Sequence, residues 1–276
     1  MAAEDQESPP ADQAAINQEK GEPHVFYETS GDFTLGYRWL SSEDSLEAAD
    51  YMYPNSSAAF GLNLLSCPLP YRYHVNAEFL SSYDFYTDAG FAYNDLVLFR
   101  DILVGVQHNL PHFNYHFSGE TPELSYSDRN PGDKYYTDFT SNLSSLRLKA
   151  PDFPLHAFVT HRHVEQDGRV QQRFLLGSFD SAGMVSQSRD IDWTSNALKL
   201  GANSHIGPFE IEYANDQARF LPGHSNILYD NYPVSGTRPA DIYPHNVVPE
   251  TESSAHSVKL HSSYTGGIVT AATLSN

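Results

Sequence analysis

The chain has 276 residues, with 16 Lys and Arg against 35 Asp and Glu, which gives a formal net charge of −19. This sign argues against a protein that follows a nucleic-acid backbone, and Lys and Arg are too sparse for a polybasic lipid-binding segment. No stretch approaches the roughly 18 apolar residues of a membrane helix, but a transmembrane β-strand needs only about ten residues of alternating polarity. The single cysteine, Cys67, leaves no C-x-x-C-H motif for covalent haem attachment.

Residues 1–23 are rich in Gln, Glu, Ala and Pro and show no hydrophobic periodicity. This composition buries too little apolar surface to fold, so it predicts a disordered N-terminal tail. Over residues 24–276 the dominant hydrophobic period is two rather than 3.6, which predicts an all-β domain. A helix is expected only at 41–53.

The stretch GDFTLGYRWL (31–40) shows the alternation most clearly. Phe33, Leu35, Tyr37 and Trp39 lie on one side of the expected strand, with polar or small residues on the other. The same pattern predicts about twelve strands. The clearest of the others are at 56–65, 71–80, 112–118, 155–163, 194–206 and 209–214, with two more at 257–264 and 268–274.

The expected connections fall into two sizes. Short ones, rich in Pro and Gly, are expected at 66–70, 108–111, 150–154, 207–208 and 265–267. Long ones are expected at 41–55, 81–90, 119–141 and 216–255. Tight turns on one side of a sheet and long loops on the other are typical of outer-membrane barrels. From 31 to 163 the long and short connections alternate in step with strand parity, but between about 173 and 193 this alternation breaks, which indicates a missed or wrongly assigned strand there.

The polar faces of the expected strands are mixed in character, which suits a wet barrel interior. The side chains expected to face this lumen are Arg38, Arg72, His74, Glu78, His112, Asn114 and His116. A large soluble β-sandwich is the alternative, but its strands usually run about five or six residues. Strands of about nine or ten residues instead suit a tilted bilayer crossing, so the sequence predicts an antiparallel transmembrane β-barrel.

The last expected strand, 268–274, has no following strand to pair with and lacks a terminal aromatic residue. A barrel must pair its last strand with its first, because otherwise two edges of unsatisfied backbone face lipid. We therefore expect these strands to be the N-terminal part of a larger barrel that is incomplete in this chain.

No pattern in the chain predicts catalysis, since the P-loop, the nucleophile elbow and the H-E-x-x-H motif are all missing from the sequence. His112 with His116, and His161 with His163, each offer two imidazoles on one strand face, but no third ligand has matching spacing. The acidic loop around 128–138 lacks the ligand spacing of an EF-hand. The sequence predicts no catalytic residue, no metal site and no enzyme.

Three stretches carry a resemblance to a known family: GDFTLGYRW (31–39), FRDILVGVQHNLPHFNY (99–115) and DIDWTSNALKLGANSHIGPFEIEYANDQARF (190–220). The last contains a long strand, a Gly-Pro turn and a returning strand. In the placement of aromatic, Gly and Asp residues these stretches resemble the MtrB/PioB-like family, the outer-membrane β-barrels of porin–cytochrome electron conduits.

The resemblance implies a barrel in the bacterial outer membrane that sheathes a multihaem c-type cytochrome and supports extracellular electron transfer. The haem is then supplied by the partner cytochrome, and the other contacts are with outer-membrane lipid, not with nucleic acid. Some members carry an N-terminal C-x-x-C, which this sequence lacks. The alternatives are a diffusion porin or solute channel and, further away, a soluble β-rich binding protein or carbohydrate-active enzyme.

Overall fold

The computed structural model describes residues 29–39, 56–113, 125–177, 183–223, 227–263 and 269–275. These residues are all-β, as predicted, and their sheet is antiparallel apart from one short strand. No helix among them is long and apolar enough to cross a membrane. The predicted tail at 1–23 and the predicted helix at 41–53 lie outside the described residues.

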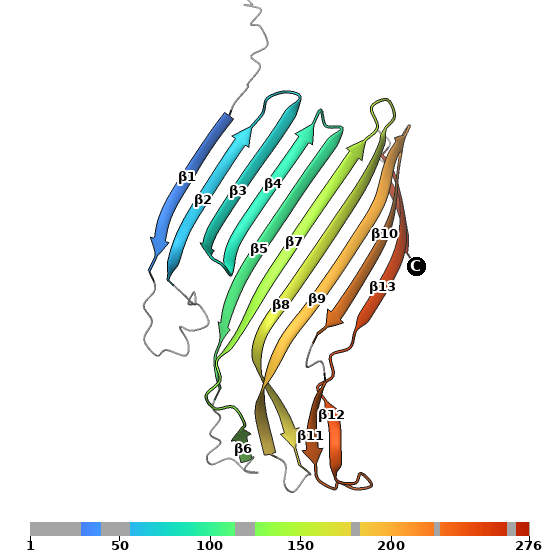
Figure 1. The fold of residues 1–276 in the computed structure, drawn as a ribbon. Coiled ribbons are helices and arrows are strands. Elements are labelled where there is room, and N and C mark those ends of the chain that lie inside the picture. Colours follow the sequence, from blue (N-terminus) through green and yellow to red (C-terminus); the bar gives the residue numbers. More distant parts are fainter. Residues whose placement is uncertain are drawn as a thin grey trace, which may run out of the picture.

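A meander of long, tilted strands dominates the molecule (Figure 1). The strands are β1 (Thr29–Arg38), β2 (Ser57–Ser66), β3 (Tyr71–Ser81), β4 (Asp84–Tyr93), β5 (Val97–Leu110), β6 (Ser125–Asp128), β7 (Tyr135–Lys149), β8 (Leu155–Leu176), β9 (Gly183–Ile206), β10 (Phe209–Pro222), β11 (Leu228–Tyr232), β12 (Asp241–His245), β13 (Thr251–Ser263) and β14 (Val269–Ser275).

The main sheet has twelve strands in the order β1-β2-β3-β4-β5-β7-β8-β9-β10-β13-β14, with β6 added in parallel to β9. β11 and β12 form a separate hairpin. In the described part of the chain, β1 pairs with β2 alone and β14 with β13 alone, so the sheet is open at both edges. Closure into a barrel is therefore a proposal and not a property of the described strands.

Several expected connections need correction. Residues 81–90, expected as a long loop, contain the tight turn between β3 and β4 and then the first part of β4. Residues 108–110, expected in a turn, are the end of β5. The strand expected at 112–118 does not form at 112–113, and the rest of it is not described. The short connections at 150–154 and 207–208 are confirmed, and they lie at the same end of the sheet, the upper end in Figure 1.

Residues that pair across neighbouring strands project from the same face, so the register divides the sheet into two faces. One face carries a set of exposed apolar side chains that we call the apolar belt. Its members include Phe33, Leu35, Tyr37, Phe60, Leu62, Tyr71, Tyr73, Phe91, Phe99, Leu148, Leu200, Phe209, Ile211, Tyr213, Val258 and Leu260. Exposure reaches 74% at Leu35, so no second sheet formed by the described residues covers the belt.

The belt crosses the strands obliquely. The ladder through Leu35, the middle of the belt on β1, reaches β10 at Leu221. This is about ten residues from Ile211, where the belt crosses that strand. At about 3.3 Å per residue and about 4.8 Å per strand, the offset over eight strand spacings corresponds to a strand tilt of roughly 40° from the normal of the belt.

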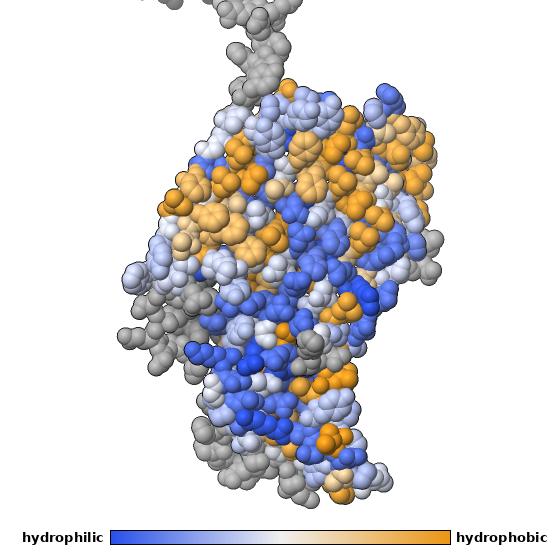
Figure 2. All heavy atoms as spheres, viewed as in Figure 1, coloured by the Kyte–Doolittle hydropathy of each residue, from blue (hydrophilic) through white to orange (hydrophobic). Residues whose placement is uncertain are grey.

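The long central strands change sidedness along their length. Near the short connections the belt face carries Leu148 and Val159, but further along β7 and β8 the same face carries Asp138, Glu165 and Asp167. Over that length the opposite face becomes apolar, with Val104, Val106, Phe139, Val164, Trp193 and Phe220. Figure 2 shows the change on one face, with orange gathered over the upper sheet and blue over much of the lower part.

β8 and β9 have 22 and 24 residues, about twice the 9–11 residues that cross a bilayer at a tilt. Their lower ends carry β6 and lie beside the β11–β12 hairpin (Figure 1). Phe174 of β8 packs on His245 of β12 with ring centroids 4.3 Å apart, and Leu228 of β11 is buried. This end of the molecule, which we call the extension, packs around its own small core beyond the belt.

Candidate functional site on the inner wall

The candidate site lies on the face opposite the apolar belt, which we call the inner wall. Four of the predicted lumen-facing residues, Arg38, Arg72, His74 and Glu78, share this face. They are brought together because each lies on a strand whose alternate residues belong to the belt. Whether this face lines a lumen depends on closure of the barrel.

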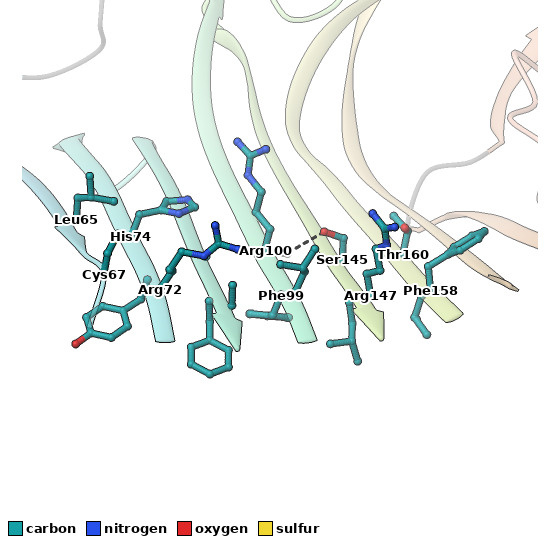
Figure 3. Close-up of a pocket in the computed structure, with 17 residues that line it drawn as sticks. Leu65, Cys67, Arg72, His74, Phe99, Arg100, Ser145, Arg147, Phe158 and Thr160 are labelled. Carbon is teal, nitrogen blue, oxygen red and sulfur yellow. Dashed lines mark hydrogen bonds between the residues drawn. The ribbon is translucent and has the colours of Figure 1, made fainter. Parts of the chain in front are cut away.

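Two neighbouring ladders form a hollow of about 590 Å³ in the inner wall. One ladder runs Arg72–Ala92–Leu98–Arg147–Phe158, and the other runs His74–Gly90–Arg100–Ser145–Thr160. Ala92 and Gly90, the latter covered by the His74 ring, belong to the lining of the hollow, and cationic side chains stand around it. Figure 3 shows Arg72, His74, Arg100, Arg147 and Phe158 rising from the same side of the strands.

Asp88 anchors one edge of this hollow. Arg100 donates two hydrogen bonds to its carboxylate, from Nε at 2.9 Å and Nη2 at 2.7 Å. His74 Nε2 lies 3.3 Å from the same carboxylate, and the Asp88 side chain is only 13% exposed. A bidentate charge-assisted pair of this kind fixes the direction of the guanidinium.

Further cross-strand ion pairs follow the inner wall on both sides of the hollow. Arg38 Nη1 lies 2.7 Å from Asp84 Oδ2, and Lys259 Nζ lies 2.8 Å from Glu212 Oε1. A longer contact of 3.5 Å joins Lys199 and Asp216. These cross-strand ion pairs make the inner wall polar, and within each pair the positive charge is compensated by a carboxylate.

Three cations of the inner wall are not balanced in this way. Among the described residues, no ion pair joins Arg147, Lys149 or Arg162 to a carboxylate, and all three side chains are exposed. Arg147 instead contacts the ring of His156, which adds no negative charge. The wall therefore presents unpaired positive charge on β7 and β8.

His112, predicted to face the lumen, belongs to a different cluster beyond the end of β5. Its Nδ1 lies 3.0 Å from the carbonyl of Asp133, and its Nε2 lies 2.5 Å from Asp128 Oδ2. Ser186 Oγ donates to the other oxygen of Asp128 at 2.9 Å. We call this group the His112 clasp, since it ties residues 125–133 to β9.

The clasp favours a protonated imidazole because both ring nitrogens face acceptors. Burial lowers the pKa of His112, but the Asp128 carboxylate and the Asp133 carbonyl outweigh it, and the pKa is raised. Asp128 lies between Ser186 and His112, whereas a nucleophilic triad needs the histidine in the middle. The clasp geometry is that of a structural tie.

The remaining candidates do not join the inner wall. Asn114 and His116 lie outside the described residues, so their predicted orientation stays a prediction. His161 and His163 lie on the belt face beyond the belt itself, where His163 contacts Asn196 and Glu165. In the described part of the chain, no three His, Cys, Asp or Glu side chains group into a metal site.

The sequence reasoning missed Asp88, Arg100 and Arg147, which shape the hollow. Asp88 was assigned to a loop, although Phe85, Phe91 and Tyr93 alternate around it. The stretch LRLKA (146–150) places Arg147 and Lys149 opposite two leucines, and this signal was available. Comparisons of the chain with protein families, with characterised proteins and with solved structures found no match.

Proposed function

We propose that this chain forms part of the wall of an outer-membrane β-barrel that sheathes a multihaem c-type cytochrome for electron transfer across the membrane. The observation that carries the membrane assignment is the exposed apolar belt, whose normal makes an angle of roughly 40° with the strands. Strands of transmembrane barrels tilt by about 35–45°, so such a belt becomes a level ring when the sheet closes.

The inner wall supports the sheath. Its ion-paired ladders offer hydrogen-bonding groups to a polar protein core, while the belt keeps a low dielectric outside. The chain carries no C-x-x-C-H motif, so any c-type haem belongs to the partner. The cytochrome itself is drawn from the resemblance of residues 31–39, 99–115 and 190–220 to the MtrB/PioB-like family.

The proposal also assigns a direction. The end with the connections at 150–154 and 207–208 faces the periplasm, and the extension beyond the belt faces the exterior. The change of sidedness on β7 and β8 fits this assignment. Beyond the lipid the outer face of the strands meets water and should be polar. The opposite face packs within the extension and should be apolar.

The second candidate, a diffusion porin, uses the same belt but a water-filled lumen. Basic side chains line anion-selective pores, so the cations Arg147, Lys149 and Arg162, which form no ion pair with a carboxylate of the described residues, favour the porin. A soluble β-rich protein is the weakest candidate because side chains such as Leu35 and Tyr37 stay exposed in a broad apolar surface.

The test is purification of the full-length protein from the outer-membrane fraction in a mild detergent. The sheath predicts a co-purifying protein with c-type haem absorbance, in fixed proportion to the barrel. A haem-free protein that conducts ions in planar bilayers would establish the porin instead. A protein that stays monomeric in buffer without detergent would overturn both membrane functions.

A further inference from the structure

We propose that the inner wall binds an acidic, carboxylate-rich segment of the polypeptide that fills the barrel, an inference that rests on the proposed sheath. The binding surface is a group that we call the cationic strip. It consists of Arg72 on β3, Arg100 on β5, Arg147 and Lys149 on β7, and Arg162 on β8.

The register places these cations on one face within a short distance. Arg72 and Arg147 share a ladder through Ala92 and Leu98, and Arg100 lies one step along on β5. From β3 to β8 the strip crosses four strand spacings, which at about 4.8 Å each is roughly 20 Å. The hollow of about 590 Å³ opens between its members.

The cationic strip is positive, whereas the chain as a whole is negative. The chain carries a formal net charge of −19, yet the inner-wall positions of β5, β7 and β8 hold no Asp or Glu as far as Gln166. Asp88 and Asp95 pair with Arg100 and Arg72 from neighbouring positions. The three other cations keep their full charge for an external partner.

The extent of the strip favours a polypeptide over a small anion. A single phosphate or carboxylate ion reaches one or two cations, whereas a width of roughly 20 Å matches several acidic side chains of one segment. Lipid headgroups are excluded by position because the strip lies on the face opposite the belt. Phe158 and Leu98 beside the hollow add apolar contact for the stems of such side chains.

The experiment measures binding of fluorescein-labelled decaglutamate and decalysine to the full chain in a non-ionic detergent by fluorescence anisotropy. We expect the acidic peptide to bind and the basic peptide not to bind. The substitution Arg147→Glu should weaken binding about threefold, and the combination with Lys149→Glu and Arg162→Glu at least about tenfold. Raising the salt from 50 mM to 500 mM should have a similar effect.

Lys134→Glu is the control matched to Arg147→Glu, because each replaces one exposed cation by a carboxylate and Lys134 lies in the extension. Its peptide affinity should stay within about twofold of the wild type. Heat-modifiable migration on gels shows whether each variant still folds. Equal binding by the wild type and the triple variant, or an equal loss in Lys134→Glu, would overturn the cationic strip.

The strip and the sheath fail in different ways. If the triple variant retains a haem protein from the native outer membrane as fully as the wild type, the strip is wrong and the sheath stands. If the wild type binds decaglutamate through the strip but retains no haem protein, the sheath is wrong and the surface stands as an acidic-peptide site.

Discussion

The imidazole of His74 lies across Gly90, its ladder partner on β4, so closely that a Cβ at residue 90 would meet His74 Cε1 at 2.3 Å. The same arrangement recurs where Phe85 covers Gly105 and where Phe158 covers Gly201. A ring laid over a glycine shields the backbone of the neighbouring strand and fixes its own direction. At Gly90 this arrangement also brings His74 to Asp88.

The first prediction concerns Gly90→Ala. The added methyl group must displace the His74 ring, which can rotate, so we expect a modest loss of about 1 kcal/mol in the free energy of unfolding. In a His74→Ala background the same substitution should be nearly neutral, because the clash has been removed. Urea titrations of protein folded into lipid vesicles, followed by tryptophan fluorescence, measure both values.

Gly168→Ala is the control for this prediction. Gly168 has a φ of 141°, and a Cβ there would lie 2.2 Å from the backbone carbonyl oxygen of Tyr136. A backbone atom cannot rotate away, so the loss should exceed that of Gly90→Ala by about 1–3 kcal/mol. If the two substitutions cost the same, the His74 ring is not what Gly90 accommodates.

The second prediction tests the apolar belt. Leu62 lies in the middle of β2 on the belt face, and Asn63 lies beside it on the inner wall. An arginine on the lipid face near the bilayer midplane costs about 2–4 kcal/mol, so Leu62→Arg should impair folding into vesicles by this amount. Asn63→Arg should cost much less, since its side chain enters the polar side. Equal costs at both positions would contradict a lipid-facing belt.

The third prediction concerns the pH dependence of the His112 clasp, which lies in the extension. The pKa of His112 is raised, so the pair stabilises the fold fully below the ordinary pKa of histidine. This contribution is lost as the pH rises through the raised value. Burial raises the pKa of Asp128, but contacts with His112, Asn130 and Ser186 lower it overall, so stabilisation is also lost in strong acid.

Hydrogen exchange of residues 125–133 measures this dependence. Protection should fall between mildly acidic and mildly alkaline pH in the wild type and should become independent of pH over that interval in His112→Gln. Asp128→Asn should flatten the profile as well, because it removes the carboxylate that holds the proton. A wild-type profile that is flat, or that rises with pH, would show that the clasp is not charged.

The strands that the sequence predicted well are those with one face in the belt. In β1, β2 and β3 most alternate residues on the belt face are large and apolar, so period two is visible without any tertiary information. β4 was assigned to a loop because its belt face contains Thr87 and Ala89, which carry little hydrophobic signal. The ion pair that Asp88 of its polar face makes with Arg100 of β5 cannot be seen in the sequence of β4 alone.

The alternation of long and short connections breaks near 173–193 because β8 and β9 run on beyond the strands expected at 155–163 and 194–206. The sequence predicted shorter strands because the sidedness changes along them. On β8 the apolar residue moves from Val159 on the belt face to Val164 on the inner wall, which is a step of odd length. A period-two pattern read from one end is therefore out of phase at the other. The cationic strip as a whole could not be seen in the sequence, because its members are spread over four strands, β3, β5, β7 and β8, which become neighbours only through the register.

The last prediction tests the orientation. Asp152 lies in the exposed connection between β7 and β8, and Lys134 is exposed at the opposite end of β7. In a Cys67→Ser background, Lys134→Cys should react with a membrane-impermeant maleimide on intact cells. Asp152→Cys should react only after the outer membrane is permeabilised, because outer-membrane barrels keep their short turns in the periplasm. The opposite pattern would invert the barrel, and labelling of both positions on intact cells would place the chain outside the membrane.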